Sequence, residues 1–460
     1  MAGSEMDTMS STAFDAVELA FADEARATVL VGCDPGAIDT VCLQHFINRF
    51  GRMAWRRPLS TDEASRYQTL YETLAATSSS AEAISYVMAG FLQSPNFMYV
   101  EENGQSDPSG FRRFTDFEIA SRLSLGLWDL PPDSELLDAA ERGELSNPDT
   151  LRPHIQRLLN DPKAEQGIMR VLSEYFMLSE LDQIVKNTEV YPTASSALFA
   201  DMKTELQWLL DRFSAANQNF MTAFNTDRVY VNSRLANLYG LEGPADTATF
   251  MEMQVAEPER KGILSRAGVL ARLGDTDHPS STLRGFFVFE KILCGVVPPP
   301  PSNLAPQLAA AREDAANQGL SERELRELHI SEPSCVGCHS RFDPVGYAFG
   351  AFDGIGALEP NDSNGLIDIS GAFPAIGDAP EVPVDGPEQI ADLLSERDEA
   401  AACVARHLFR GVVGHTETDW ELSEVLPAQW EGFLSTGQIR PLLEELLVSQ
   451  AFLLGQRAGE

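Results

Sequence analysis

Basic side chains are scarce in this 460-residue sequence, which has 34 Lys and Arg against 69 Asp and Glu and a formal net charge of -35. Such an acidic surface repels phosphate backbones and anionic lipid headgroups, so nucleic acid is not an expected partner. Acidity keeps a protein soluble, and it also suits docking to a basic redox partner.

Long apolar runs are missing as well. No stretch of about 18 apolar residues occurs, so the sequence predicts no membrane-spanning segment. The first seven residues, Met1 to Asp7, lack the basic and then apolar pattern of a secretion signal. Because the cysteine chemistry described below belongs outside the cytoplasm, we expect a periplasmic or secreted protein whose natural start lies upstream of Met1.

Strand-like alternation is rare and is confined to short pieces such as 366–369, whereas helical periodicity dominates. Apolar residues recur at spacings of three and four in two stripes: Ile84, Val87, Met88, Phe91 and Leu92, and Leu151, Ile155, Leu158 and Leu159. Capping boxes that start helices are formed by Ser60 with Glu63 and by Thr115 with Glu118. The sequence therefore predicts a mainly α fold of several packed helical modules.

Turn-rich breaks divide the chain, which is too long for one compact core. Breaks fall at 103–110, at 240–246 and at four prolines over 298–301, which form a stiff spacer before an expected helix over 308–328. Acidic turns are expected at Asp343-Pro344 and Asp353-Gly354. The predicted segments are a remnant of a preceding helical module over 1–30, helical modules over 31–102, 112–242 and 258–330, and a C-terminal module over 331–460.

Cysteine is also infrequent, yet Cys335, Cys338 and His339 form a C-x-x-C-H motif. Two thiols about one helical turn apart can each bond a haem vinyl group, while the imidazole of the next residue reaches the iron. With six Cys and seven His in the chain, a chance match is expected about 0.001 times. The motif predicts one covalent haem c in a C-terminal cytochrome c-like haem module, with Cys335 and Cys338 as thioether anchors and His339 as iron ligand.

Two other uses of such a motif are weaker. Zinc also accepts Cys and His but needs a fourth ligand, commonly from a second pair, and no second C-x-x-C or H-x-x-x-H occurs. A thioredoxin-like dithiol belongs in a βαβ context that this region lacks. A non-catalytic scaffold or adhesion module with a zinc-bound or empty motif stays open as an alternative.

The sixth iron ligand decides between electron relay and chemistry on a small molecule. No methionine follows Met253, so the downstream methionine of many small cytochromes is not present. His278 is the first choice, because it lies in a polar turn with Arg284 close enough in sequence to meet a haem propionate. The remaining candidates are His329, His407, His415, Met251 and Met253, and an open site is the last alternative.

The other four cysteines suit disulfides. Cys33 and Cys42 are separated by eight residues, a loop that a disulfide can close, and Cys294 and Cys403 are then left to pair. Two thioethers and two bridges would account for all six cysteines in an oxidising compartment.

Several motifs together resemble a cytochrome c-like family of large extracytoplasmic proteins from planctomycetes and myxobacteria, built from helical domains of unknown function (the fifteen-eighties and fifteen-nineties DUF series) around one C-x-x-C-H. The resemblance covers about residues 30–455. It is carried by segments 50–59, 92–99, 117–128, 231–236, 266–270, 283–285, 293–294, 335–346, 352–356 and 367–371.

The resemblance implies architecture and a haem but no substrate, because the function of the family is unsettled. The sequence has Phe342 where the family usually has Met, and Gly350-Ala351 where it usually has Glu-Asn. Family members also tend to begin with a signal and one more helical module, and residues 11–32 resemble the tail of that module.

We therefore predict a monohaem c-type cytochrome-like redox protein that passes single electrons to or from an unknown partner outside the cytoplasm. The alternative is a haem-dependent oxidoreductase with an open iron site that acts on peroxide or an organic substrate. The sequence leaves open whether the protein is an enzyme.

Overall fold

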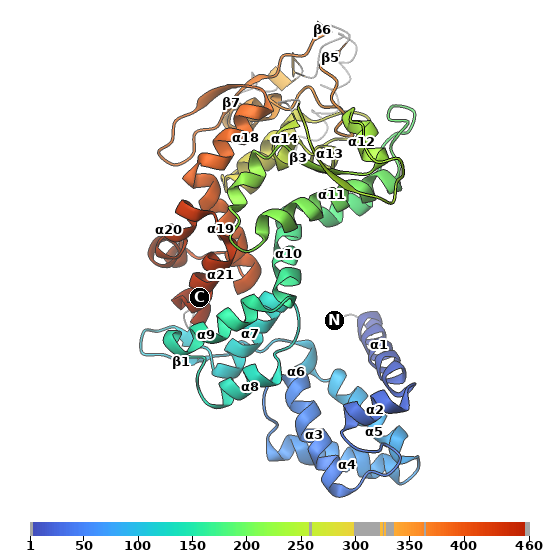
Figure 1. Cartoon of the computed structure of the whole chain (residues 1–460). Coiled ribbons are helices and arrows are strands. Elements are labelled where there is room, and N and C mark those ends of the chain that lie inside the picture. Colours follow the sequence, from blue (N-terminus) through green and yellow to red (C-terminus); the bar gives the residue numbers. More distant parts are fainter. Residues whose placement is uncertain are drawn as a thin grey trace. The chain divides into compact units, whose positions relative to one another are not determined.

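The structure is a computed structural model that describes residues 3–256, 260–298, 323–324, 326–327, 335–362 and 365–455. Helices dominate these residues (Figure 1), which confirms the mainly α prediction. The chain forms two compact units. The first comprises 1–167, 412–414 and 446–460, and the second comprises 168–411 and 415–445. Their boundary after Gly167 falls inside the segment 112–242 that we expected to form one module.

The first unit contains two groups of helices and a small sheet. Its helices are α1 (Gly3–Phe21), α2 (Glu24–Val31), α3 (Thr40–Trp55), α4 (Thr61–Ala75), α5 (Ser80–Leu92), α6 (Pro95–Met98), α7 (Asp116–Trp128), α8 (Ser134–Glu141), α9 (Pro148–Asn160), the start of α10 (Lys163–Tyr175) and α22 (Gln450–Leu453). Its strands are β1 (Gln105–Ser106), β2 (Arg112–Arg113) and β9 (Leu454–Gly455), in the order β1-β2-β9 with antiparallel pairing.

The helix starts and the apolar stripe that the sequence predicts in this unit are present in the structure. The apolar stripe of α5 is buried at Ile84, Val87, Met88 and Phe91, and both capping boxes start their helices. These residues pack with α3 and α4 around Phe46 and Phe91. The described part of the segment 1–30 contains α1 and most of α2, and α1 packs on α5. This N-terminal segment therefore adds to the hydrophobic core formed by α3, α4 and α5.

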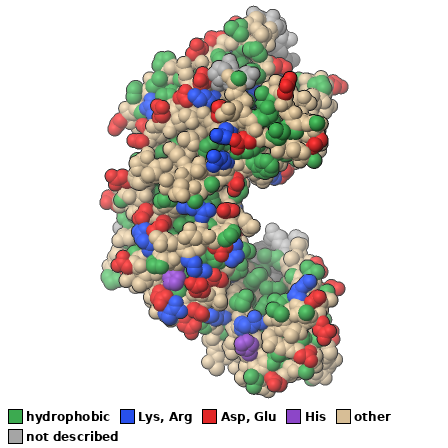
Figure 2. All heavy atoms as spheres, viewed as in Figure 1, with side chains coloured by type: hydrophobic (Ala, Val, Ile, Leu, Met, Phe, Trp, Pro, Cys, Tyr) green, Lys and Arg blue, Asp and Glu red, His purple; other side chains and the backbone are tan. Residues whose placement is uncertain are grey.

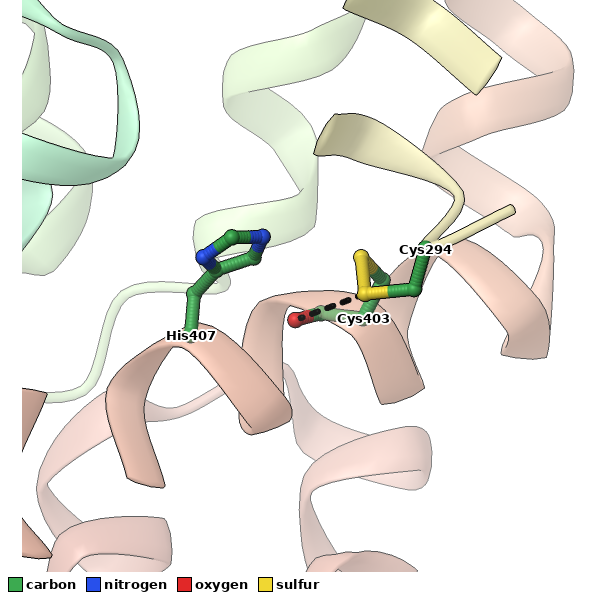
Figure 3. A group of neighbouring side chains, drawn as sticks. All are labelled: Cys294, Cys403 and His407. Atoms are coloured by element: carbon green, nitrogen blue, oxygen red, sulfur yellow. Dashed lines mark hydrogen bonds between the residues drawn. A yellow bond between two sulfur atoms is a disulfide. The ribbon is translucent and has the colours of Figure 1, made fainter. Parts of the chain in front are cut away.

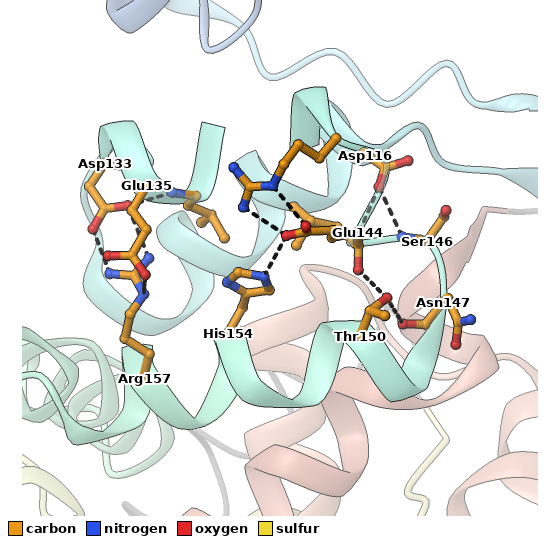
Figure 4. Close-up of polar contacts among 12 residues, drawn as sticks. Asp116, Asp133, Glu135, Glu144, Ser146, Asn147, Thr150, His154 and Arg157 are labelled. Carbon is orange, nitrogen blue, oxygen red and sulfur yellow. Dashed lines mark hydrogen bonds and ion pairs between the residues drawn. The ribbon is translucent and has the colours of Figure 1, made fainter. Parts of the chain in front are cut away.

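Polar contacts join α8 and α9 at the surface of the same unit (Figure 4). Arg157 on α9 forms ion pairs with Asp133, at 2.7 Å, and with Glu135, at 3.1 Å. Glu144, in the loop before α9, contacts His154 at 3.4 Å. Because these groups are partly exposed, each pair contributes at most about 1 kcal/mol to stability.

The second unit is helical with short antiparallel hairpins. Its helices are the rest of α10, η1 (Leu178–Gln183), α11 (Ser196–Ser214), η2 (Phe220–Phe224), α12 (Ser233–Tyr239), η4 (Ile263–Ser265), α13 (Ala267–Arg272), α14 (Ser281–Phe287), η5 (Val288–Ile292), α17 (Val336–Tyr347), α18 (Pro387–Glu396), most of α19 (Asp398–Val413), η6 (Glu421–Val425), α20 (Leu426–Thr436) and most of α21 (Ile439–Val448). Its hairpins pair β3 (Arg228–Val231) with β4 (Met251–Gln254), β5 (Asn361–Asp362) with β6 (Gly365–Leu366), and β7 (Ser370–Phe373) with β8 (Val382–Asp385).

Three sequence predictions for the second unit are not confirmed. The expected strand over 366–369 is wrong in its bounds, because β6 ends at Leu366 and β7 begins at Ser370. The acidic turn at Asp343-Pro344 is also wrong, because both residues lie inside α17. The predicted helix over 308–328 and the proline run over 298–301 fall largely outside the described residues.

None of the described helices is long and apolar enough to cross a bilayer. In Figure 2 the acidic side chains are scattered over the visible face.

Helices α14 and α17 cross at two glycines. A Cβ atom on Gly346 would lie 1.9 Å from the Ser281 carbonyl oxygen, and one on Gly285 would lie 1.9 Å from the Phe342 carbonyl oxygen. The backbones of the two helices therefore touch, and any side chain at these positions would force them apart. This contact positions α17, the helix that carries the cysteine motif.

We expect Gly346→Ala to lower the free energy of unfolding by about 1–3 kcal/mol, the usual cost of overpacking a core. Gly337→Ala, in the same helix, is the matched control, because a Cβ there has no neighbour within 4 Å. Urea unfolding followed by circular dichroism measures both. Equal midpoints for the two variants would contradict the tight helix crossing.

Candidate functional site

The cysteine motif lies at the start of α17. Cys335 is the N-cap residue, and its carbonyl oxygen accepts hydrogen bonds from the backbone N–H groups of Cys338, at 3.2 Å, and His339, at 3.1 Å. Cys338 and His339 are therefore one helical turn beyond Cys335. Both motif cysteines are half-buried and take part in neither disulfide. The local geometry is the one that attachment at two vinyl groups and an adjacent iron ligand requires.

His339 is oriented by a buried carboxylate. Its Nδ1 atom lies 2.9 Å from Oδ2 of Asp343, one turn further along α17, and the Asp343 side chain is 0% exposed. The carboxylate accepts the proton-bearing Nδ1–H, so a bond to a metal would come from Nε2. The ring also packs against Phe342, with centroids 4.9 Å apart.

Arg284 lies in the crossing helix, α14, and is 1% exposed. Its guanidinium donates hydrogen bonds to the carbonyl oxygens of Phe349 and Phe352, both at 2.8 Å, and of Asp353, at 2.6 Å. It thereby holds the loop that follows α17. These three bonds give the side chain a structural role, and its predicted contact with a haem propionate stays a prediction.

His278 is exposed, in a turn closed by the bridge between Gly274 and Pro279. Lys186 holds this turn by donating to the carbonyl oxygens of Gly274, at 2.9 Å, and Asp275, at 2.7 Å. Burial, and then the charge of Arg284, lower the pKa of Lys186 to about 8. The turn is therefore rigidly supported by polar contacts.

The crossing of α14 and α17 sets the place of this turn. Ser281, at the start of α14, meets Gly346 near the end of α17, whereas Gly285 meets Phe342. The two helices therefore run antiparallel. His278 precedes the start of α14, which lies against the C-terminal end of α17, whereas His339 lies near the N-terminal end of α17. The structure does not bring the two histidines together.

The other candidate ligands have different surroundings. His407 stacks on Tyr175 with ring centroids 4.1 Å apart, and its Nε2 atom lies 3.1 Å from the Lys291 carbonyl oxygen. Burial lowers the pKa of His407 to about 4, so it is neutral at pH 7. His415 contacts Glu421 at 2.9 Å, and the two methionine candidates lie on β4. His329 lies outside the described residues.

Both predicted disulfides are present, Cys33–Cys42 and Cys294–Cys403. The second joins the end of η5 to α19 and lies beside His407 (Figure 3). Within the part of the chain that the structure describes, Cys294, Cys403 and His407 form the only trio of metal-ligating side chains whose ligand atoms all lie within 4.8 Å of one another. Because its sulfurs are bonded to each other, this trio lacks the thiolates that a metal would need.

The side chains of the C-x-x-C-H motif do not bring their ligand atoms together as that trio does. Cys335, Cys338 and His339 are all described, yet their ligand atoms form no such compact group. Zinc requires its ligands around a common centre at about 2.0–2.3 Å. Haem attachment instead needs thiols at two separate vinyl groups.

A cavity of about 780 Å³ opens beside the C-terminal half of α17. Tyr347 and Gly350 line it, with Tyr191 and Asp353 among the facing residues. Tyr347 lies eight residues, a little over two helical turns, after His339. Burial raises the pKa of Asp353 and of Tyr347. The volume lies within the range of cofactor and ligand sites, about 300–1,000 Å³.

Comparison with protein families gives three matches. All three matching family models are described as "Protein of unknown function". They are DUF1595, which matches residues 42–102, DUF1592, which matches residues 114–241, and DUF1588, which matches residues 260–362. The last range includes the cysteine motif, α14 and α17. Three models of domains of unknown function thus match successive parts of the chain, which agrees in part with the sequence resemblance. No curated protein and no solved structure gave a significant match.

Proposed function

We propose that the protein is a redox protein of the c type, with one haem bonded covalently to Cys335 and Cys338 and ligated by His339. The observation that carries the proposal is the start of α17, where Cys335 caps the first turn and Asp343 orients the imidazole. When bound, the haem would supply one-electron oxidation and reduction. The role of the chain is to hold and orient it.

The proposed location is outside the cytoplasm, in the periplasm or as a secreted protein. Two disulfides support it, because cytoplasmic thiols are kept reduced. The acidic surface suits a basic partner protein that exchanges single electrons with the haem. Three matching domains of unknown function are compatible with this role but name no partner.

A second candidate function is chemistry at an open iron site, on peroxide or an organic substrate. It is favoured by the positions of the described histidines, since His407 and His415 have other partners and His278 lies at the far end of α17. The cavity beside Tyr347 could admit a small molecule near the same helix.

We expect the reduced haem protein to bind carbon monoxide readily, with a shift of its absorbance maximum, because none of these histidines reaches the site. His278→Ala is the matched variant, and we expect the same carbon monoxide spectrum from it as from the wild type. Absorbance during stepwise reduction, with and without the gas, measures both redox activity and access. A reducible haem indifferent to carbon monoxide would favour pure electron relay, and no redox transition would contradict the main proposal.

A further inference from the structure

We propose that Asp343 is a positioning residue that makes His339 a strong electron donor and so favours the oxidised state of the bound iron. This inference rests on the proposed function. It concerns the regulation of the same site, namely the direction in which the protein tends to pass electrons.

Asp343 stands out because of its burial. Its side chain is 0% exposed, and its Oδ2 atom accepts a 2.9 Å hydrogen bond from His339 Nδ1. The second oxygen, Oδ1, is buried with no hydrogen-bond partner among the described residues. A carboxylate without full pairing is costly to bury, by several kcal/mol, so its presence calls for a role beyond stability.

Aromatic rings pack around the buried carboxylate, while the His339 side chain is 26% exposed. The ring of Phe342 contacts His339, and Phe286 of α14 packs edge-on against Phe342 with centroids 5.6 Å apart. Tyr347 is 5% exposed, and burial together with the negative charge of Asp343 raises its pKa. Water is therefore largely kept from the carboxylate, and its field on the imidazole is weakly screened.

Two effects of this arrangement act in the same direction. A carboxylate that accepts the Nδ1–H bond raises the basicity of Nε2, the atom that would bond the iron. A negative charge close to the iron in a poorly screened setting also stabilises Fe³⁺ over Fe²⁺. Both lower the reduction potential, and the protein should give up an electron more readily than one whose histidine donates to a backbone carbonyl.

The test compares the midpoint potential of the haem-loaded wild type with that of Asp343→Asn, which keeps the side-chain shape and removes the charge. We expect the potential to rise by about 59 mV or more, a factor of ten in the one-electron equilibrium. Asp343→Glu should recover part of the difference. Asp385→Asn, which removes the same charge from an exposed position on β8, is the control and should change the equilibrium less than twofold.

A second measurement uses the wild type alone, so it does not depend on whether the variants fold. Resonance Raman spectra of the five-coordinate reduced wild type, obtained directly or by photolysis of its carbon monoxide form, should show an iron–histidine stretch at higher frequency than in a haem protein whose histidine donates to a carbonyl oxygen. If haem is attached but the stretch is ordinary and Asp343→Asn leaves the potential unchanged, the inference is wrong and the proposed function stands. If the wild type attaches no haem, both fail.

Discussion

Replacement of both Cys335 and Cys338 by alanine is expected to abolish covalent haem retention. Each thiol bonds one vinyl group, so the double variant keeps no covalent link, and each single variant keeps one at reduced yield. Haem staining after denaturing electrophoresis measures this, because only covalently held haem stays with the chain. The loss in the double variant should be complete, which makes this the largest effect that we expect.

Val336→Ala is the matched control. Val336 lies between the two cysteines in the first turn of α17 and is 40% exposed, so its truncation should leave haem staining at the wild-type level. Haem that stays with the double cysteine variant through denaturation would show that attachment occurs elsewhere in the chain.

Loss of the Cys294–Cys403 disulfide is expected to be the largest single change in stability. It closes a loop with a sequence separation of 109, and chain entropy alone predicts a loss of about 4.8 kcal/mol when both residues become serine. The bridge encloses the whole cysteine motif and ties η5 to α19. We therefore expect the second unit to unfold at much lower urea concentration, as followed by circular dichroism.

The Cys33–Cys42 disulfide provides the internal comparison. Its sequence separation is 9, so the same entropy argument predicts a smaller loss of about 2.6 kcal/mol, and in the first unit. Removal of each bridge should thus affect a different part of the unfolding curve. If Cys294→Ser with Cys403→Ser leaves that curve unchanged, the bridge does not constrain the second unit.

Local sequence signals predict much of the fold and part of the site. Capping boxes at Ser60 and Thr115, the apolar stripe of α5 and the start of α17 each depend on residues a few positions apart. Such patterns follow from helix geometry alone. The disulfide partners were also predictable, because two of the six cysteines were assigned to haem and two others were close in sequence.

The remaining features depend on contacts between segments far apart in the sequence. Arg284, for which the sequence predicted a propionate contact that stays untested, binds carbonyl oxygens 65 to 69 residues later, in the loop after α17. Glu205, wholly buried and with its pKa raised to about 7 by burial, contacts Tyr239 at 2.6 Å. No periodicity indicates such pairs, since charged residues are usually exposed.

Asp343 was missed for a different reason. The dipeptide Asp343-Pro344 is typical of a turn, and we expected a turn at this point. In the structure α17 continues to Tyr347, where the contact between Gly346 and Ser281 holds it. The spacing of four between His339 and Asp343 is the signal that could have revealed the pair, because residues at i and i+4 are neighbours on a helix.

The most direct test of the haem proposal is the pyridine haemochrome spectrum of the full chain, produced with a haem-attachment system in an oxidising compartment. We predict a c-type absorption band with about one haem per chain. A folded, colourless protein under the same conditions would contradict the proposal and leave a zinc-bound or empty cysteine motif as the better account.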